Sequence, residues 1–250
     1  MKKVLAIAFS LTTLFASAQE TALLFKEADN FERQQKEPEA LDKYKQVLVA
    51  EPTNVKALVK ATELTCYTSA RLTNKNDKRL GYESALAYAQ RAVKADTTSA
   101  DAWYAVSVAS NKMVEVETEN KKIAAFMRDI KTDAEKAVTL NPKQAKATFM
   151  IGKWYYDMTV MPGAKRTAIK LLYGGLPDIS LDSAIAYLEK SKTLDPYFVL
   201  NQYTLAKAYR EDNKPAKEME VLNRLVKLPT RTFDDIALKE EGQKRLQELQ

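Results

Sequence analysis

The chain has 250 residues, of which 46% are hydrophobic and 29% charged, so it is long enough to bury a sizeable core. It contains no histidine and one cysteine, Cys66, which excludes histidine general bases, most zinc sites, cysteine metal clusters and an internal disulfide. It also lacks a glycine-rich phosphate loop and a Gly-x-Ser-x-Gly elbow. We therefore expect no enzyme activity, no catalytic residues, no bound metal and no cofactor, and we expect Cys66 to be a small buried apolar residue.

Residues 1–18 are predicted to be a secretory signal peptide. Lys2 and Lys3 supply a positive start, Val4–Phe15 is mostly apolar, and Ala16-Ser17-Ala18 is a small-x-small cleavage site. The segment is too short for a stable transmembrane helix, and no later segment has about 18 unbroken apolar residues, so no stable membrane span is expected. Without Lys2 and Lys3 the 39 basic residues fall to 37 against 33 acidic ones, an excess too small to indicate nucleic acid. The prediction is an exported protein, periplasmic or secreted, with residues 19–250 as one repeat domain.

Four segments of similar pattern end on an acidic or amide residue followed by proline or threonine, at residues 51–52, 96–97, 141–142 and 195–196. Small or apolar residues recur 5, 8 and 12 positions before the proline or threonine of each segment. Segment by segment, they are Val47, Tyr44 and Ala40; Ala92, Ala89 and Ala85; Ala137, Ala134 and Ile130; and Ser191, Leu188 and Ala184. A pattern repeated in this way predicts a repeat array.

The spacing matches the tetratricopeptide pattern, whose unit of about 34 residues contains two helices. Position 8 of the first helix is generally small, and in successive units it is Ala28, Thr62, Ser107, Gly152 and Ala206. A small residue there lets the two helices of a pair approach closely, and the proline ends the second helix because it cannot donate a helical hydrogen bond. The sequence predicts an all-α, tetratricopeptide-like helical solenoid of about five helix pairs.

Three of the units are longer than the pattern requires. Units two and three each carry about 11 extra residues, which is close to three helical turns, so we expect lengthened helices with ends and turns at 71–79 and 115–122. Unit four carries an insertion at about 160–180 that holds half of the glycines. Between its glycines and prolines, Ala164–Tyr173 is a short helix candidate in which Ile169, Leu172 and Tyr173 share a face. It is either a flap packed on the solenoid or a lid or interfacial segment.

The C-terminal segment is predicted to be a capping helix. Thr232 or Asp234 is the expected N-cap of a helix over 235–249, whose many polar residues suit the outer face of a last layer.

Several segments resemble the regulator of microtubule dynamics family. The similarity covers roughly residues 22–249, and it is carried by Tyr82–Ala95, Ala102–Tyr104, Ala134–Pro142, Gly152–Tyr156, Leu172–Pro177, Ala184–Pro196 and Leu205–Tyr209. The resemblance implies a tetratricopeptide-like fold without enzyme activity, and its eukaryotic members are linked to microtubules and organelle membranes. This chain differs from them in its export signal and in lacking a membrane anchor. The expectation that carries over is the fold, with a groove for a peptide or a lipid-like ligand.

The first helices of the pairs are expected to line the groove with positions 5, 9 and 12, which share one stripe. Aromatic residues fill four of the five positions numbered 5, and charges at positions 9 and 12 run from acidic in the first units to basic in the last. The predicted ligand-binding residues are Phe25, Tyr104, Phe149, Lys153, Tyr156, Tyr203, Lys207 and Arg210. In the alternative interpretation, position 5 packs between repeats and the charges are solvated.

The function expected from these features is a non-enzymatic scaffold that binds a protein or peptide segment in its concave groove. The alternative is a carrier of a lipid or another amphipathic small molecule. An anionic part of either ligand is expected near Lys153, Lys207 and Arg210.

Overall fold

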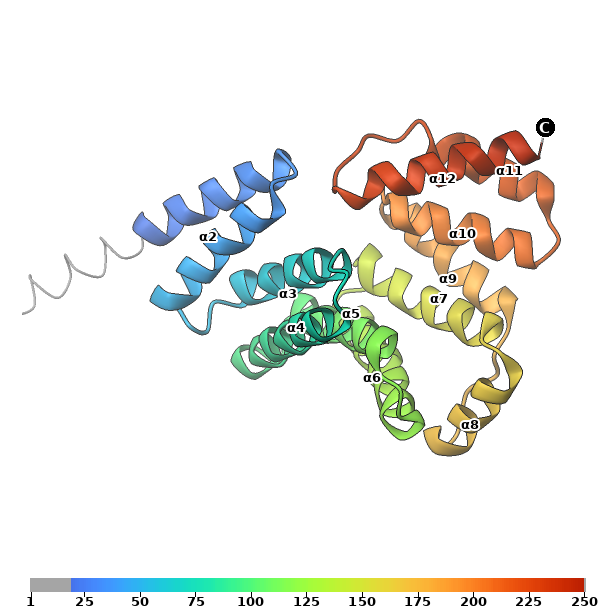
Figure 1. The fold of residues 1–250 in the computed structure, drawn as a ribbon, viewed down its shortest axis with the longest axis horizontal. Coiled ribbons are helices and arrows are strands. Elements are labelled where there is room, and N and C mark those ends of the chain that lie inside the picture. The colour runs from blue at the N-terminus through green and yellow to red at the C-terminus, as the bar shows by residue number, and fades with distance from the viewer. Residues whose placement is uncertain (1–18, 250) are drawn as a thin grey trace, which may run out of the picture.

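The computed structural model describes residues 19–249, and within this range the regular structure is entirely helical (Figure 1). The predicted signal peptide, residues 1–18, lies outside the described residues. A helix over 19–33 comes first. It is followed by α2 (Glu37–Ala50), α3 (Val55–Ala70), α4 (Lys75–Ala95), α5 (Ala100–Val116), α6 (Asn120–Leu140), α7 (Ala145–Val160), α8 (Gly163–Tyr173), α9 (Leu181–Leu194), α10 (Val199–Glu211), α11 (Pro215–Leu225) and α12 (Asp234–Glu248).

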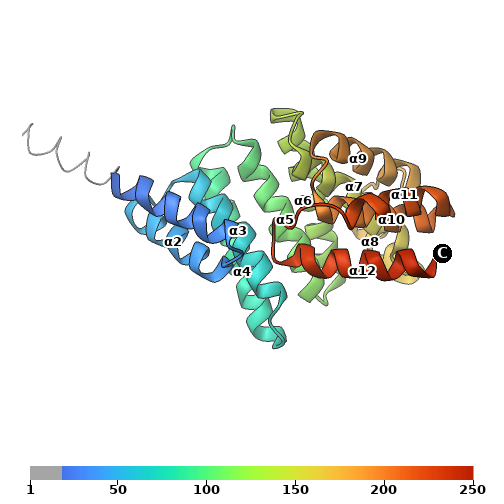
Figure 2. The same cartoon turned by 90° about the horizontal axis from the view of Figure 1, so that it is seen from above.

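The helices form antiparallel pairs that stack into a curved solenoid (Figures 1 and 2). The helix over 19–33 pairs with α2, α3 with α4, α5 with α6, α7 with α9, and α10 with α11. The last helix, α12, packs on α10 and α11. The predicted solenoid of five pairs with a C-terminal capping helix is therefore confirmed.

The second helices end at the residues that the repeat pattern predicts. Glu51, Asp96, Asn141 and Asp195 are the C-caps of α2, α4, α6 and α9, and each backbone N–H bonds the carbonyl of the residue four positions earlier. The side chains of the last three also accept a hydrogen bond from the backbone N–H two residues on. Such Asx turns redirect the chain into the next first helix.

Close helix approach at position 8 is also confirmed, since all five small residues lie in the interior of their pairs. A Cβ atom added at Gly152 would lie 3.0 Å from the backbone nitrogen of Leu188, so α7 and α9 approach too closely for any larger side chain. Ser107 uses its hydroxyl instead, donating a 2.7 Å hydrogen bond to the carbonyl of Ile130 on α6. This bond satisfies a polar group that is fully buried.

The longer units have lengthened second helices, as predicted. Both α4 and α6 have 21 residues, whereas α2 and α9 have 14. The unit-four insertion forms α8, which packs against α6 as a flap at the edge of the solenoid (Figure 1). Ile169 and Tyr173 are buried there, but Leu172 is exposed, so the prediction that all three share the packed face is wrong for Leu172. Among the helices of residues 19–249, none is long and apolar enough to cross a membrane.

The start of the capping helix differs from the prediction. Helix α12 begins at Asp234, its N-cap position is Phe233, and no side chain caps it. The carboxylate of Asp235 instead accepts hydrogen bonds from the backbone N–H groups of Arg231 and Thr232, at 2.8 and 2.9 Å. Neither Thr232 nor Asp234 is the cap, because the carboxylate inside the first turn folds the preceding loop back onto the helix.

Candidate functional site

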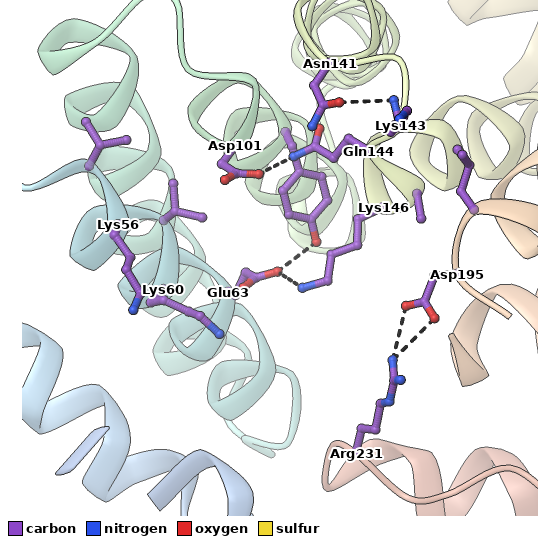
Figure 3. Close-up of a pocket in the computed structure, with 15 residues that line it drawn as sticks. Lys56, Lys60, Glu63, Asp101, Asn141, Lys143, Gln144, Lys146, Asp195 and Arg231 are labelled. Carbon is purple, nitrogen blue, oxygen red and sulfur yellow. Dashed lines mark hydrogen bonds and ion pairs between the residues drawn. The ribbon is translucent and has the colours of Figure 1, made fainter. Parts of the chain in front are cut away.

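A groove of about 870 Å³ crosses the inner face of the solenoid (Figure 3). Its walls come from the first helices of successive pairs, α3, α5 and the start of α7, together with the turn before α7. Asp195, at the end of α9, and Arg231, in the loop before α12, complete the lining. The groove therefore joins residues that are far apart in sequence, and the stacking of the repeats brings them together.

A buried carboxylate lies at the centre of this groove. Glu63 on α3 accepts hydrogen bonds from the Lys146 ammonium at 2.6 Å and from the Tyr104 hydroxyl at 3.0 Å. Its side chain is only 7% exposed. Burial alone would raise the pKa of Glu63, but Lys146 and Lys60 together hold it below the ordinary value. Glu63 is therefore an anion in the folded protein at neutral pH, and it fixes the positions of the lysine and tyrosine on either side.

The same pairing continues toward the first helix. Lys60, one turn before Glu63, donates to Glu32 at 2.7 Å, and Glu32 also accepts a hydrogen bond from the buried Tyr44 hydroxyl. Burial would lower the pKa of Lys60, but Glu63 and Glu32 outweigh it and raise that pKa. Charged groups of opposite sign thus alternate along this wall.

The loop over 229–233 contributes Arg231 to the lining of the groove. Arg231 pairs with Asp195 at 3.2 Å, and it also lines the adjoining hollow beside Glu32 and Lys60. Next to this loop, Arg71 at the end of α3 pairs with Asp234 at 2.6 Å and with Glu37 at the start of α2. These contacts join the first two helix pairs to the capping helix, which lies at the opposite end of the sequence.

An apolar chamber of about 510 Å³ adjoins the groove between α3, α10 and α12. Its exposed lining is mainly apolar, and Lys146, Asp195 and Arg231 lie at its junction with the groove. The apolar lining residues are Tyr67, Ala70, Tyr197, Phe198, Val199, Leu200, Ala237 and Leu238.

Of the eight predicted ligand-binding residues, Tyr104 lines the groove and the other seven do not. Phe149 is buried against Phe198, with ring centroids 5.0 Å apart, and Tyr156 is also buried. Phe25 packs edge-on against Tyr44. Phe149 therefore packs between repeats, as in the alternative interpretation, whereas Phe25 packs within its own helix pair. Their role as ligand contacts stays a prediction.

The three predicted basic residues, Lys153, Lys207 and Arg210, do not form an open cationic site, because each already contacts aromatic rings or a carboxylate. Lys207 lies over the rings of Tyr156 and Tyr203, 5.6 and 5.7 Å from their centroids. The other two are paired with carboxylates, Lys153 with Asp157 and Arg210 with Glu218.

The expected change from an acidic to a basic end of the groove is therefore not found. In the first units the acidic groups are also paired, Glu32 with Lys60 and Glu63 with Lys146. Most charges on the stripe are therefore paired with a neighbour of opposite sign, and Lys207 lies over aromatic rings instead.

Sequence reasoning missed Lys146, Asp195 and Arg231 as groove residues. Lys146 occupies position 2 of its first helix, three residues before position 5, and Asp101 occupies the same position one unit earlier. Residues three apart share a helix face, so extending the stripe to position 2 would have predicted Lys146 and Asp101 as groove residues. Arg231 follows the last repeat, and no repeat pattern places that loop.

Stacked helix pairs with this spacing, and a groove lined by their first helices, define a tetratricopeptide-repeat protein. A tetratricopeptide-repeat protein of Thermus thermophilus has the same fold, with a TM-score of 0.65 and 13% identity over 91% of this chain and 99% of that one. PilF of Pseudomonas aeruginosa superposes with a TM-score of 0.55 and 11% identity, over 94% and 93% of the two chains. At these identities the similarity establishes the fold.

Within this class, the chain belongs to the family described as regulator of microtubule dynamics protein 1-3, which matches residues 24–250. Regulator of microtubule dynamics protein 1 of Mus musculus is 30% identical over 174 residues, covering 68% of this chain and 56% of the mouse protein. The Homo sapiens protein of the same name is 32% identical over 141 residues, covering 55% of this chain and 44% of the human protein. The chain thus spans about half the length of these relatives. Both relatives are named as regulators of microtubule dynamics.

Proposed function

We propose that this protein is a non-enzymatic scaffold whose inner groove binds an extended segment of a partner protein. The observation that carries the proposal is the groove at Glu63, Lys146 and Arg231, which runs across the first helices of three successive pairs. Its opposite charges are held in place by one another, and Tyr104 and Val59 supply apolar surface between them. A pre-ordered surface of this kind binds a segment with little further loss of side-chain entropy.

The binding segment is expected to carry both charged and apolar side chains. Because Lys146 and Arg231 each already have a carboxylate partner, an incoming anion must share or replace that partner. Specificity then arises from matching the alternating charges of the wall, since like charges placed opposite one another are strongly unfavourable. A peptide segment whose charges are all of one sign would match only part of the groove wall.

A peptide library panned on the immobilised full chain tests this proposal. Selected peptides are then titrated against the unmodified chain and against Lys143→Ala/Arg231→Ala, which removes two exposed groove cations. Binding should weaken about tenfold or more, corresponding to about 1.4 kcal/mol. The matched control is Lys94→Ala/Lys190→Ala, which removes two exposed lysines from α4 and α9 outside the groove. Equal affinity for the groove and control variants would contradict groove binding.

A second candidate function is carriage of a lipid or another amphipathic small molecule, which the apolar chamber favours. Its volume lies within the usual range for small-molecule sites, and its exposed lining is mainly apolar with charged residues at the edges, including Glu32, Lys112 and Asp234. Native mass spectrometry of gently purified protein should then show a bound mass that Leu238→Arg, at the chamber wall, removes. A ligand-free mass together with peptide binding would favour the scaffold.

We also propose that the protein is exported and works in the periplasm or outside the cell. The support is the sequence pattern of residues 1–18. Mass spectrometry of protein from the native cell, fractionated by compartment, tests this. A chain starting at Gln19 in the exported fraction supports the proposal, whereas an intact Met1 in the cytoplasmic fraction contradicts it.

A further inference from the structure

The flap helix α8 is apolar on two opposite faces, and only one of them is covered. Ile169 and Tyr173 form the covered face, where the Tyr173 ring lies 6.0 Å from that of the buried Trp154. Arg128 on α6 donates hydrogen bonds to the carbonyls of Leu172 and Tyr173 at the end of the helix. These contacts fix α8 on the solenoid, so its outward face is held in a defined orientation.

The outward face of α8 presents Ala164, Leu171 and Leu172. Leu171 is 81% exposed and Leu172 is 44% exposed, and Val160 at the end of α7 is also largely uncovered. Ala164 and Leu171 lie seven residues apart on the same face of the helix. A helix that is apolar on both faces is normally covered on both, so this arrangement points to a partner for the outward face.

The charged residues on α8 itself are all basic, and Asp178, which follows the helix, lines a hollow with Arg166 and Lys170. Between Asp157 and Asp178 the charged residues are Lys165, Arg166 and Lys170. The side chain of Arg166 bonds the carbonyl of Thr159, while Lys170 is exposed. In the groove, by contrast, acidic and basic side chains pair, as Glu63 does with Lys146. The basic α8 flap therefore complements a negatively charged partner.

We propose that α8 is a peripheral docking element that places Leu171 and Leu172 in the surface of an anionic membrane. Leucine side chains flanked by lysines suit the boundary between headgroups and acyl chains, where the apolar groups enter and the ammonium groups remain with the phosphates. The argument for a membrane rests on exposed Leu171 and Leu172 on a helix whose own charged residues are all basic. Figure 1 shows α8 at the edge of the solenoid, away from α3 and the start of α12, so the groove stays open when the flap is docked.

The docking should be reversible and dependent on salt. Each basic residue near an anionic surface adds attraction that falls off within a Debye length. Two leucines and three basic residues bind far more weakly than an inserted transmembrane helix.

The buried Cys66 makes a direct test possible, because a cysteine placed on the surface can be labelled alone. The full-length Leu171→Cys variant is labelled with an environment-sensitive fluorophore and mixed with vesicles of phosphatidylcholine alone or with about 30% phosphatidylglycerol. The expected result is a blue shift with the anionic vesicles and little shift with the neutral ones. Adding Lys165→Glu/Lys170→Glu to the labelled variant should lower the apparent affinity about tenfold or more. Because every sample contains residues 1–18, any contribution of this segment to vesicle binding is equal in all samples.

The matched control is Val49→Cys, since Val49 is 84% exposed on α2 and distant from α8. Its label should not shift, even if another part of the chain contacts the vesicles. The proposal is overturned if position 171 stays unshifted on anionic vesicles, or if position 49 shifts equally. It is also overturned if the double charge reversal changes nothing. A shift at position 171 that needs no vesicles and grows with protein concentration would show a second copy of the chain as the partner instead.

Discussion

Lys146, at the start of α7, donates a 2.6 Å hydrogen bond to Glu63 on α3, a residue 83 positions earlier in the chain. The pair links the second and fourth helix pairs across the groove, with the Tyr104 hydroxyl of the third pair on the same carboxylate oxygen. One buried anion thus connects three successive first helices. A change at either residue is expected to alter the curvature of the inner face as well as the charge of the groove.

Replacing Lys146 should destabilise the protein because it removes a partner from a buried carboxylate. For Lys146→Met we expect a loss of about 1–3 kcal/mol in the free energy of unfolding, since Glu63 retains Tyr104 and Lys60. The exposure of Lys146 itself places the effect toward the low end. Urea denaturation measures this change. The matched control, Lys143→Met at the exposed turn beside it, should stay within about 0.5 kcal/mol, and an equal loss there would contradict the assignment.

The same carboxylate predicts how stability depends on pH. Because the pKa of Glu63 is lowered in the folded state, the unfolded chain binds more protons in acid. The stability that the ionised Glu63 contributes is therefore fully present above the ordinary glutamate pKa of about 4.3. It is lost as the pH falls through the pKa of Glu63 in the folded protein. The difference in unfolding free energy between the unmodified chain and Glu63→Gln should shrink below that pH. Denaturation midpoints between pH 7 and pH 3 test this, and a constant difference would disprove it.

Two glycines of the fourth unit, Gly152 and Gly163, should respond oppositely to alanine. Gly152→Ala places a Cβ 2.9 Å from the Leu188 side chain and 3.0 Å from its backbone nitrogen, so we expect a net loss of about 1–2 kcal/mol despite better helix propensity. Gly163→Ala meets nothing within 4 Å and should leave stability unchanged or raise it by up to about 1 kcal/mol. Thermal unfolding of both variants compares them directly, and equal shifts would show that α7 and α9 are not in tight contact.

Arg71 is expected to hold the loop before α12 against the first two helix pairs. It pairs with Glu37, whose side chain is nearly buried, and with Asp234, and it lies over the Phe233 ring at 4.8 Å. In Arg71→Ala, backbone amides over 229–235 should exchange hydrogen faster, while those of α6 and α7 should not change. Hydrogen exchange read by mass spectrometry distinguishes the two regions. Arg91→Ala, which removes an exposed arginine from α4, serves as the control.

Cys66 should be inert toward thiol reagents in the folded protein. It is fully buried, and burial raises the pKa of its thiol to about 12, so almost no thiolate exists at neutral pH. Reaction with a coloured disulfide reagent should be slow in buffer and complete in denaturant. Rapid reaction under native conditions would show that α3 opens locally.

The repeat architecture was predictable because its signals are local. Where the second helices end depends on residues such as Asn141 and Asp195, whose side chains turn the chain within a few positions. Close approach at Gly152 follows from the absence of a side chain there. The lengthened α4 and α6 followed from the number of extra residues, because three whole turns preserve the buried face.

The position of the groove was decided by the tertiary structure. Glu63 and Lys146 are far apart in the chain, and only stacking brings them within hydrogen-bond distance. The sequence placed Lys153 and Arg210 on the expected stripe, but both are paired with carboxylates. Asp157 lies one turn after Lys153 in α7, whereas Glu218 reaches Arg210 only because α10 and α11 pack together. Arg231 lies in a loop with no repeat pattern, and its place at the groove depends on the Asp235 carboxylate and on Asp195. Local chemistry determines the helices and their ends, whereas charge pairing between distant segments requires the assembled solenoid.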